Sequence, residues 1–247
     1  MFSQRGVKRV SEKDHVDSPF WVSLSDMMIS TMMIFLIMAV VTIVVMQRHM
    51  NMIGDDGRKS NERQIEIERF ANNVKNKSKE ISPAPRISTI KDTVRIDLGE
   101  SVNFVSGSSE ISKEGKDFLN QYIPKLLDVA RDDLGQKWLK RIVVEGFTDS
   151  DGSYLFNLDL SLERSRKVVC AMFEPINDSG KRAMSKEDLN LVRDLVLVGG
   201  YSFNSMQSSK ARSRRVELKL EFWEVDEKER FGKTSRPDLK DKDFGKC

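Results

Sequence analysis

The chain has 247 residues, which is enough for one membrane segment and one sizeable soluble domain. Its net charge is only +3 although 32% of its residues are charged, and this excludes the strongly basic footprint of a nucleic-acid-binding protein. The only histidines, His15 and His49, flank one apolar run, so histidine zinc sites and Ser-His-Asp triads are excluded from the region beyond it. The two cysteines, Cys170 and Cys247, are too few for a disulfide framework and too far apart in the sequence for a CxxC site. We therefore expect no enzyme, no metal and no cofactor.

The first element is an apolar run from Phe20 to Met46, in which Asp26 is the only charged residue. The run exceeds the roughly 20 residues that span a bilayer core, and no small-residue cleavage pattern follows it. Basic residues before the run favour a cytoplasmic amino end. The sequence therefore predicts a cytoplasmic segment at residues 1–19, an uncleaved transmembrane helix at residues 20–47, and the rest of the chain outside the cytoplasm.

Asp26 is the first candidate functional residue. Ser23 precedes it by three positions and Ser30 follows it by four, so the three residues share one face of a helix. A charge at the membrane centre costs about 2.5–3.5 kcal/mol and less near an end, so a carboxylate that merely reaches the interface is the alternative. The polar stripe favours a face turned toward other helices or water. Because intramembrane carboxylates often mark ion pathways, we favour an ion-carrying role.

Residues 48–86 are polar and charged, with sparse apolar positions, and Pro83 and Pro85 end the segment. We interpret the segment as a periplasmic linker, with a helical stalk as the alternative. Residues 87–223 have the pattern of a compact domain, and residues 224–247 alternate in charge like a solvated tail.

Within the domain, strands are predicted at residues 87–98, 138–146, 191–201 and 213–223, and helices at residues 113–134 and 158–174. The order of these elements predicts an α/β sandwich with helices on one face of a mixed sheet. Cys170 lies on the second helix and is expected to be buried, whereas Cys247 ends the tail. We expect both thiols to be free, because they pair only if the tail folds back.

A polar loop before the second helix contains the second candidate site. Counted from Asp149, the sixth residue is Tyr154 and the twelfth is Leu160, which excludes an EF-hand. Ordinary turn chemistry is one interpretation of this loop. The other is a site for a zwitterion, in which Asp149 binds an ammonium group and Arg164 binds a carboxylate through its planar fork. Spacing alone leaves both interpretations open.

Longer motifs resemble known families. "FWVSLSDMMISTMMIFLI" resembles the transmembrane helix of B-type stator subunits, the flagellar MotB and PomB group. "FVSGSSEIS", "GFTDSDGSYLFNLDLSLERS" and "RSRRVELKL" resemble the three motifs of OmpA-like peptidoglycan-binding domains, although Phe147 replaces the usual His or Tyr and Ser213 the usual Asn. The "MMIST" continuation and the charged tail are most similar to the ZorB family of the Zorya anti-phage defence systems.

The resemblance implies that Asp26 carries a permeating ion, with Ser23 and Ser30 supporting its path. We favour a proton, and sodium is the alternative. It implies a peptidoglycan-binding site, in which Asp149 and Arg164 hold the diaminopimelate of the peptide stem. The residues implied for that site are Thr148, Asp149, Phe156, Asn157, Leu160, Arg164 and Arg215.

The resemblance also implies an inner-membrane stator subunit that pairs with a second copy of itself inside a ring of polytopic A-type partners, five around two. No nucleic-acid partner is implied. A flagellar-type motility stator, a static wall anchor without ion flow, and a transporter-energising subunit of the ExbD or TolR kind are the alternatives.

Overall fold

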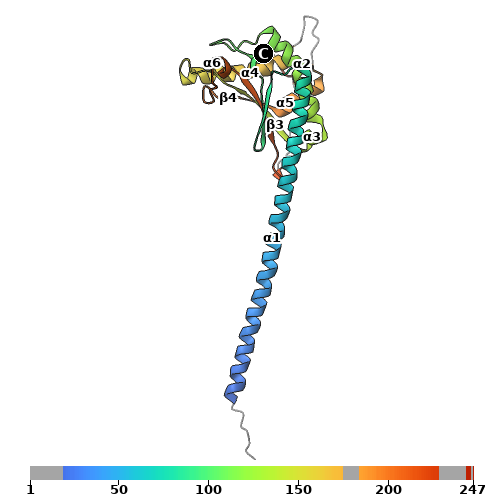
Figure 1. Cartoon of the computed structure of the whole chain (residues 1–247), viewed down its shortest axis with the longest axis vertical. Helices are drawn as coiled ribbons and strands as arrows, with labels where there is room; N and C mark the ends of the chain where they lie inside the picture. The colour runs from blue at the N-terminus through green and yellow to red at the C-terminus, as the bar shows by residue number, and fades with distance from the viewer. Residues whose placement is uncertain (1–18, 175–183, 228–242, 246) are drawn as a thin grey trace, which may run out of the picture. The chain divides into compact units, whose positions relative to one another are not determined.

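The computed structural model describes residues 19–174, 184–227, 243–245 and 247 of the chain (Figure 1). The chain divides into two compact units, Met1–Arg58 and Lys59–Cys247. Helix α1, Pro19–Ile81, contributes residues to both units. The predicted cytoplasmic segment lies outside the described residues, apart from Pro19.

The first unit contains an apolar stretch of helix α1. The stretch Leu24–Asn51 has 28 residues and a mean hydropathy of 2.7, so its length and composition suffice for it to cross a membrane. Thr31 and Thr42 lie in this stretch, and their hydroxyls donate hydrogen bonds to carbonyls of the preceding turn, as Thr42 does to Met38 at 2.7 Å. Such bonds satisfy a polar side chain without a partner helix. The sequence expectation of a helix at residues 20–47 therefore agrees with α1.

The second unit is built on a five-stranded mixed sheet with the strand order β1-β2-β5-β3-β4. Strands β3 and β4 are parallel, and the other neighbouring strands are antiparallel. The strands are β1 Arg86–Ile90, β2 Thr93–Asp97, β3 Leu139–Gly146, β4 Val196–Gly200 and β5 Val216–Phe222. The helices are η1 Gly99–Val102, α2 Lys113–Arg131, α3 Asp133–Trp138, α4 Tyr154–Phe173, α5 Lys186–Leu195 and α6 Lys210–Ser213 (Figure 1). The predicted α/β class is confirmed.

The two faces of this sheet differ, because side chains alternate along each strand. The apolar face belongs to the hydrophobic core together with residues of α2, α4 and α5; its buried residues include Val94, Ile96, Ile142, Val144, Leu218 and Leu220. The opposite face carries charges. There Arg95 Nη1 lies 2.7 Å from Glu145 and 2.8 Å from Glu217 on neighbouring strands. Each buried carboxylate therefore has a cationic partner.

Two predicted strands differ from the structure. Residues 87–98 were expected to form one strand, but they form the β1–β2 hairpin, because the chain turns at Lys91 with φ of 50°. The hydroxyl of Thr93 closes this turn with a hydrogen bond to the carbonyl of Ile90, at 2.9 Å. In the predicted strand at residues 191–201, the first half instead completes helix α5 and only the second half forms β4.

The segment expected to be a linker differs from the sequence prediction along its second half. Helix α1 continues to Ile81, and its residues Ile67, Phe70 and Val74 are buried in the core of the domain. Phe70 makes an edge-to-face contact with Phe222 of β5, with ring centroids 5.4 Å apart. These three residues are three and four positions apart, so they lie on one face of the helix. Burial of this face holds the helix against the core, even though the segment is otherwise polar.

Two polar contacts hold the same part of α1. The hydroxyl of Ser78 lies 2.7 Å from that of Tyr122 on α2, and burial raises the pKa of Tyr122 to about 12. Near the start of the second unit, Arg63 donates a 2.7 Å hydrogen bond to the carbonyl of Trp223, just after β5. Residues 59–81 therefore belong to the folded unit and are not a spacer.

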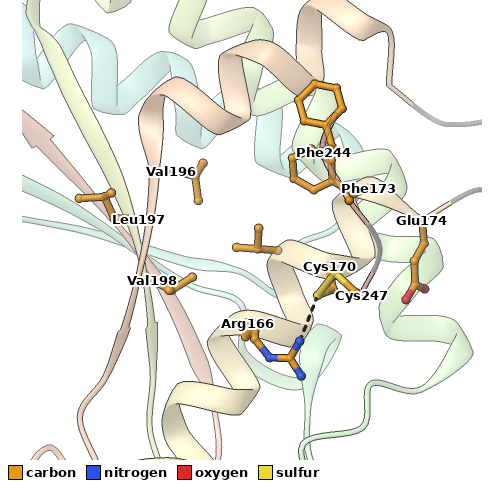
Figure 2. Close-up of a pocket in the computed structure, with 11 residues that line it drawn as sticks. Arg166, Cys170, Phe173, Glu174, Val196, Leu197, Val198, Phe244 and Cys247 are labelled. Atoms are coloured by element: carbon orange, nitrogen blue, oxygen red, sulfur yellow. Dashed lines mark hydrogen bonds between the residues drawn. A yellow bond between two sulfur atoms is a disulfide. The ribbon is translucent and has the colours of Figure 1, made fainter. Parts of the chain in front are cut away.

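The end of the chain also differs from the prediction, because Cys170 and Cys247 form a disulfide with their Cα atoms 5.8 Å apart. Phe244 packs against Phe173 of α4, with ring centroids 5.2 Å apart (Figure 2). The expectation of free thiols is therefore wrong. The last described residues are held against α4, and together with residues of α4 and β4 they line an apolar cavity of about 800 Å³.

Candidate functional site

Helix α4 approaches the carboxyl ends of β3 and β4 unusually closely. A Cβ atom at Gly146 would lie 2.0 Å from the carbonyl oxygen of Ser161, so only glycine fits there. The hydroxyl of Ser165 donates a 2.8 Å hydrogen bond to the carbonyl of Gly199. Small residues on α4 therefore face the sheet. This close contact places Arg164, which lies on the same helix, beside the loops that follow the strands.

Arg164 is fully buried, and its guanidinium is engaged by backbone carbonyls. It donates hydrogen bonds to Ser108 at 3.0 Å, to Phe147 at 2.9 Å and to Val105 at 3.2 Å. Its charge lies 5.0 Å from the ring centroid of Phe104. Arg164 thus joins the loop before α2 to the end of β3. Three of the five N–H groups of its guanidinium donate to these carbonyls, which hold the side chain in place.

Asp149 follows β3 and is nearly as buried as Arg164, with 4% of the residue exposed. Arg214 Nη1 lies 2.8 Å from one carboxylate oxygen, and the backbone N–H of Asp151 donates a 3.1 Å bond to the other. Burial opposes ionisation of Asp149, but these two hydrogen bonds and the charges of Arg214 and Arg164 hold its pKa below the ordinary value. Burial lowers the pKa of Arg164 to about 10, which leaves it charged at neutral pH.

Neighbouring residues shape the loop between β3 and α4. The side-chain amide of Asn157 donates to the carbonyls of Asp151 at 2.8 Å and Ser153 at 3.1 Å. Gly152 has a φ of 97°, a conformation that favours glycine. The buried hydroxyl of Thr148 finds no hydrogen-bond partner among the described residues. The loop is therefore held rigidly and carries one unsatisfied polar group.

The remaining predicted residues take different positions. Phe156 is 52% exposed, and Leu160 is half-buried. Arg215 is buried at 3% exposure and is bound by Glu217, with its Nη2 2.6 Å from the carboxylate. Arg215 therefore does not pair with Asp149.

Sequence reasoning missed Arg214 as the partner of Asp149. Of the two adjacent arginines in the closing motif, Arg215 was expected in the site and Arg214 was not. Adjacent side chains of an extended chain point to opposite sides, so only one of the two arginines can reach a given carboxylate. That alternation was the available signal, but it does not say which of the two arginines reaches Asp149.

The other candidate site, around Asp26, lies in the first unit. Asp26 is part of the apolar stretch of α1, two residues after its start at Leu24, and it is exposed, as is Ser30 one turn later. Ser23 lies in the same helix, but its side chain is outside the described residues. The helical backbone therefore gives the three residues the spacing of one face. Among the described residues, no group of acidic, histidine and cysteine side chains could hold a metal ion.

Comparison with known proteins identifies the family. No family model matches the sequence. The chain is 35% identical over 225 residues to the Zorya protein ZorB of Escherichia coli O139:H28, a match that covers 90% of this chain and 88% of that protein. This chain belongs to the ZorB family. The resemblance to ZorB in the sequence motifs is thereby confirmed.

Solved structures with a similar arrangement include a MotB periplasmic domain and an OmpA-like domain. The periplasmic domain of Helicobacter pylori MotB matches 62% of this chain and 88% of its own length, with 12% identity and a TM-score of 0.42. The OmpA-like domain of FopA1 from Francisella tularensis matches 57% of this chain and 82% of its own length, with 16% identity and a TM-score of 0.38. These likenesses are weak, so the assignment to the ZorB family rests on the sequence relative.

Proposed function

We propose that this member of the ZorB family is the peptidoglycan-anchored stator subunit of a proton-driven inner-membrane motor that acts in anti-phage defence. The observation that carries the proposal is Asp26, the only charged residue between Phe20 and Met46 of an apolar helix. A lone carboxylate is costly in a membrane and is retained where it has a function. The family name supports the defence role, and the resemblance to B-type stators supports the motor role.

Asp26 supplies the chemistry of this motor. A carboxylate can take up a proton and release it again, and its charge changes each time. Ser23 and Ser30 lie on the same helical face and offer hydroxyls to the permeating ion. Because Asp26 is near the amino end of the apolar stretch, it exchanges with the cytoplasmic side, while the longer remainder of the helix seals the other side.

The chain works with partners in this proposal. Its helix pairs with a second copy inside a ring of five polytopic A-type subunits, and the second unit lies in the periplasm. That unit binds peptidoglycan through the loop around Asp149. The two copies of this chain are thereby fixed to the cell wall, and the ring of A-type subunits turns around them. The rigid loop with the unsatisfied hydroxyl of Thr148 supports a binding role, because buried polar groups are ordinarily hydrogen-bonded.

Asp26→Asn tests the proposal. The substitution keeps the size and the hydrogen-bonding capacity of the side chain but removes the charge that titrates. The variant should insert and assemble as well as the unchanged chain and should lose protection against phage. The measurement is the efficiency of plating of phage on cells that express the full system, at matched yield of the purified complex.

Thr42→Val is the matched control, because it also removes a polar group from the apolar stretch. Among the described residues the hydroxyl of Thr42 bonds the carbonyl of Met38 in its own helix, so this variant should protect normally. If Asp26→Asn protects as well as Thr42→Val does, the chain is a static wall anchor and the motor role is refuted.

A further inference from the structure

Strand β4 forms one edge of the sheet. In the described part of the chain it pairs with β3 on one side, and no strand pairs with its other side. The carbonyl of Gly199 accepts a hydrogen bond from Ser165, so the open part of this edge is Val196–Val198. An open edge presents unpaired backbone N–H and C=O groups, and natural strands protect such edges with lysine, proline or bulges. The sequence of β4, VLVGG, contains neither lysine nor proline, so its edge can accept another strand.

The apolar cavity of about 800 Å³ lies along this edge (Figure 2). Val196, Leu197 and Val198 all line it, although consecutive side chains of a strand point to opposite faces. A cavity that contacts three consecutive residues lies beside the strand and not over one of its faces. Val169 and Phe173 of α4 line the cavity as well. The cavity is therefore a groove between the edge of the sheet and the second half of α4.

The register of β4 decides which side chains an added strand would place in the groove. Val198 lies opposite Val144, whose side chain belongs to the core face, so Val198 points toward the helices. Leu197 lies opposite Val143 and points to the charged face of the sheet. Every second side chain of an added strand would therefore enter the apolar groove, and the others would lie on the charged face.

The chain itself already places a segment in this groove. Phe244 packs on Phe173, and the disulfide between Cys247 and Cys170 holds the same segment on α4. The groove thus accepts a main-chain segment with an aromatic side chain. With that segment in place, the cavity still has a volume in the range of about 300–1,000 Å³ that is typical of ligand sites.

The charges at the groove indicate the kind of ligand. Arg166 and Glu174 are the charged residues among those that line the cavity. Arg166 pairs with Glu163 at 2.8 Å, and Glu174 pairs with Lys116 at 2.7 Å. Each charge is therefore already neutralised, which favours an uncharged apolar segment over a fatty acid or an anionic lipid.

We propose that the groove between β4 and the second half of α4 binds an extended segment of another protein, which adds to β4 as a further strand of the sheet. Every second residue of this segment is apolar and enters the cavity, while backbone hydrogen bonds to Val196–Val198 supply the rest of the affinity. The α4 residues of the groove are Arg166 to Glu174, whereas the loop around Asp149 precedes the other end of α4. The inference is therefore independent of the proposed wall-anchoring function.

The probe is a short synthetic peptide in which threonine alternates with valine, with phenylalanine at its centre, both ends blocked and a fluorophore attached. Fluorescence anisotropy measures its binding to the full-length protein in lipid nanodiscs. Two further peptides carry N-methyl groups on one or the other set of alternate residues, which removes the N–H groups along one edge of the peptide. One methylated peptide should bind about tenfold to a hundredfold more weakly, because hydrogen bonds to β4 are lost, and the other should bind like the unmodified peptide.

Val198→Gln tests the groove in the protein. This substitution places a polar side chain in the apolar cavity and should weaken binding of the peptide about tenfold or more. Leu197→Gln is the matched control, because Leu197 is 51% exposed and Val198 44%, but Leu197 points to the charged face. It should bind the peptide like the unchanged chain. Both variants should bind isolated peptidoglycan as the unchanged chain does, which separates this inference from the wall-anchoring function.

Four outcomes overturn the inference. The unchanged protein does not bind the peptide even at millimolar concentration, or both methylated peptides bind as well as the unmodified one. The third is equal binding of the peptide by Val198→Gln and Leu197→Gln. The fourth is self-association of the protein that Val198→Gln abolishes and the peptide does not displace, because a second copy of β4 would then occupy the groove.

Discussion

Phe70→Ala tests whether the second half of α1 is part of the folded domain. Phe70 is fully buried and packs edge-to-face on Phe222, so the substitution removes a large core side chain and leaves a cavity. Such substitutions lower the free energy of unfolding by about 3–5 kcal/mol. For a unit of this size each kcal/mol lowers the melting temperature by about 2–4 °C, so a fall of about 6–20 °C is expected.

Ile65→Ala is the control on the same helix, because Ile65 is 43% exposed. This substitution should change the free energy of unfolding by no more than about 0.5 kcal/mol. Thermal unfolding of the full-length protein in detergent, followed by tryptophan fluorescence, measures both variants, since Trp138 and Trp223 lie in the second unit. If the two variants melt within a degree or two of each other, residues 59–81 are a spacer and the packing described above is refuted.

Two further variants test other parts of the second unit. Cys170→Ser, or reduction of the protein, should lower the free energy of unfolding by about 2–4 kcal/mol, because the disulfide closes a long loop with a sequence separation of 77; an equal melting temperature with and without reductant would contradict this. Asp149→Asn should be less stable than the unchanged chain at pH 7, and the difference should narrow as the pH falls. The pKa of Asp149 is lowered in the folded state. The contribution of its carboxylate to the free energy of unfolding is therefore complete above the unfolded pKa of about 3.9, and it is lost as the pH falls through the folded pKa. Melting curves between pH 7 and pH 3 check this, and a constant difference would show that the carboxylate does not titrate as described.

Local properties of the chain were predictable from the sequence. The length of the apolar stretch and the position of Asp26 in it depend on consecutive residues only. Most strands and helices of the domain follow from the periodicity of apolar residues, and the family follows from motifs of fixed spacing. The β1–β2 hairpin was missed, because its turn at Lys91 and Asp92 contains neither glycine nor proline to mark it.

The tertiary structure decided which distant residues meet. The apolar positions of residues 59–81 are too sparse to predict burial, and only the surface formed by α2 and β5 shows that Phe70 has a place in the core. Likewise the spacing that suggests a pair of Asp149 and Arg164 is local. The choice of Arg214 over Arg215 depends on where β5 begins relative to β3. A side chain's partner is set by the packing of segments far apart in the sequence, and no local pattern records that packing.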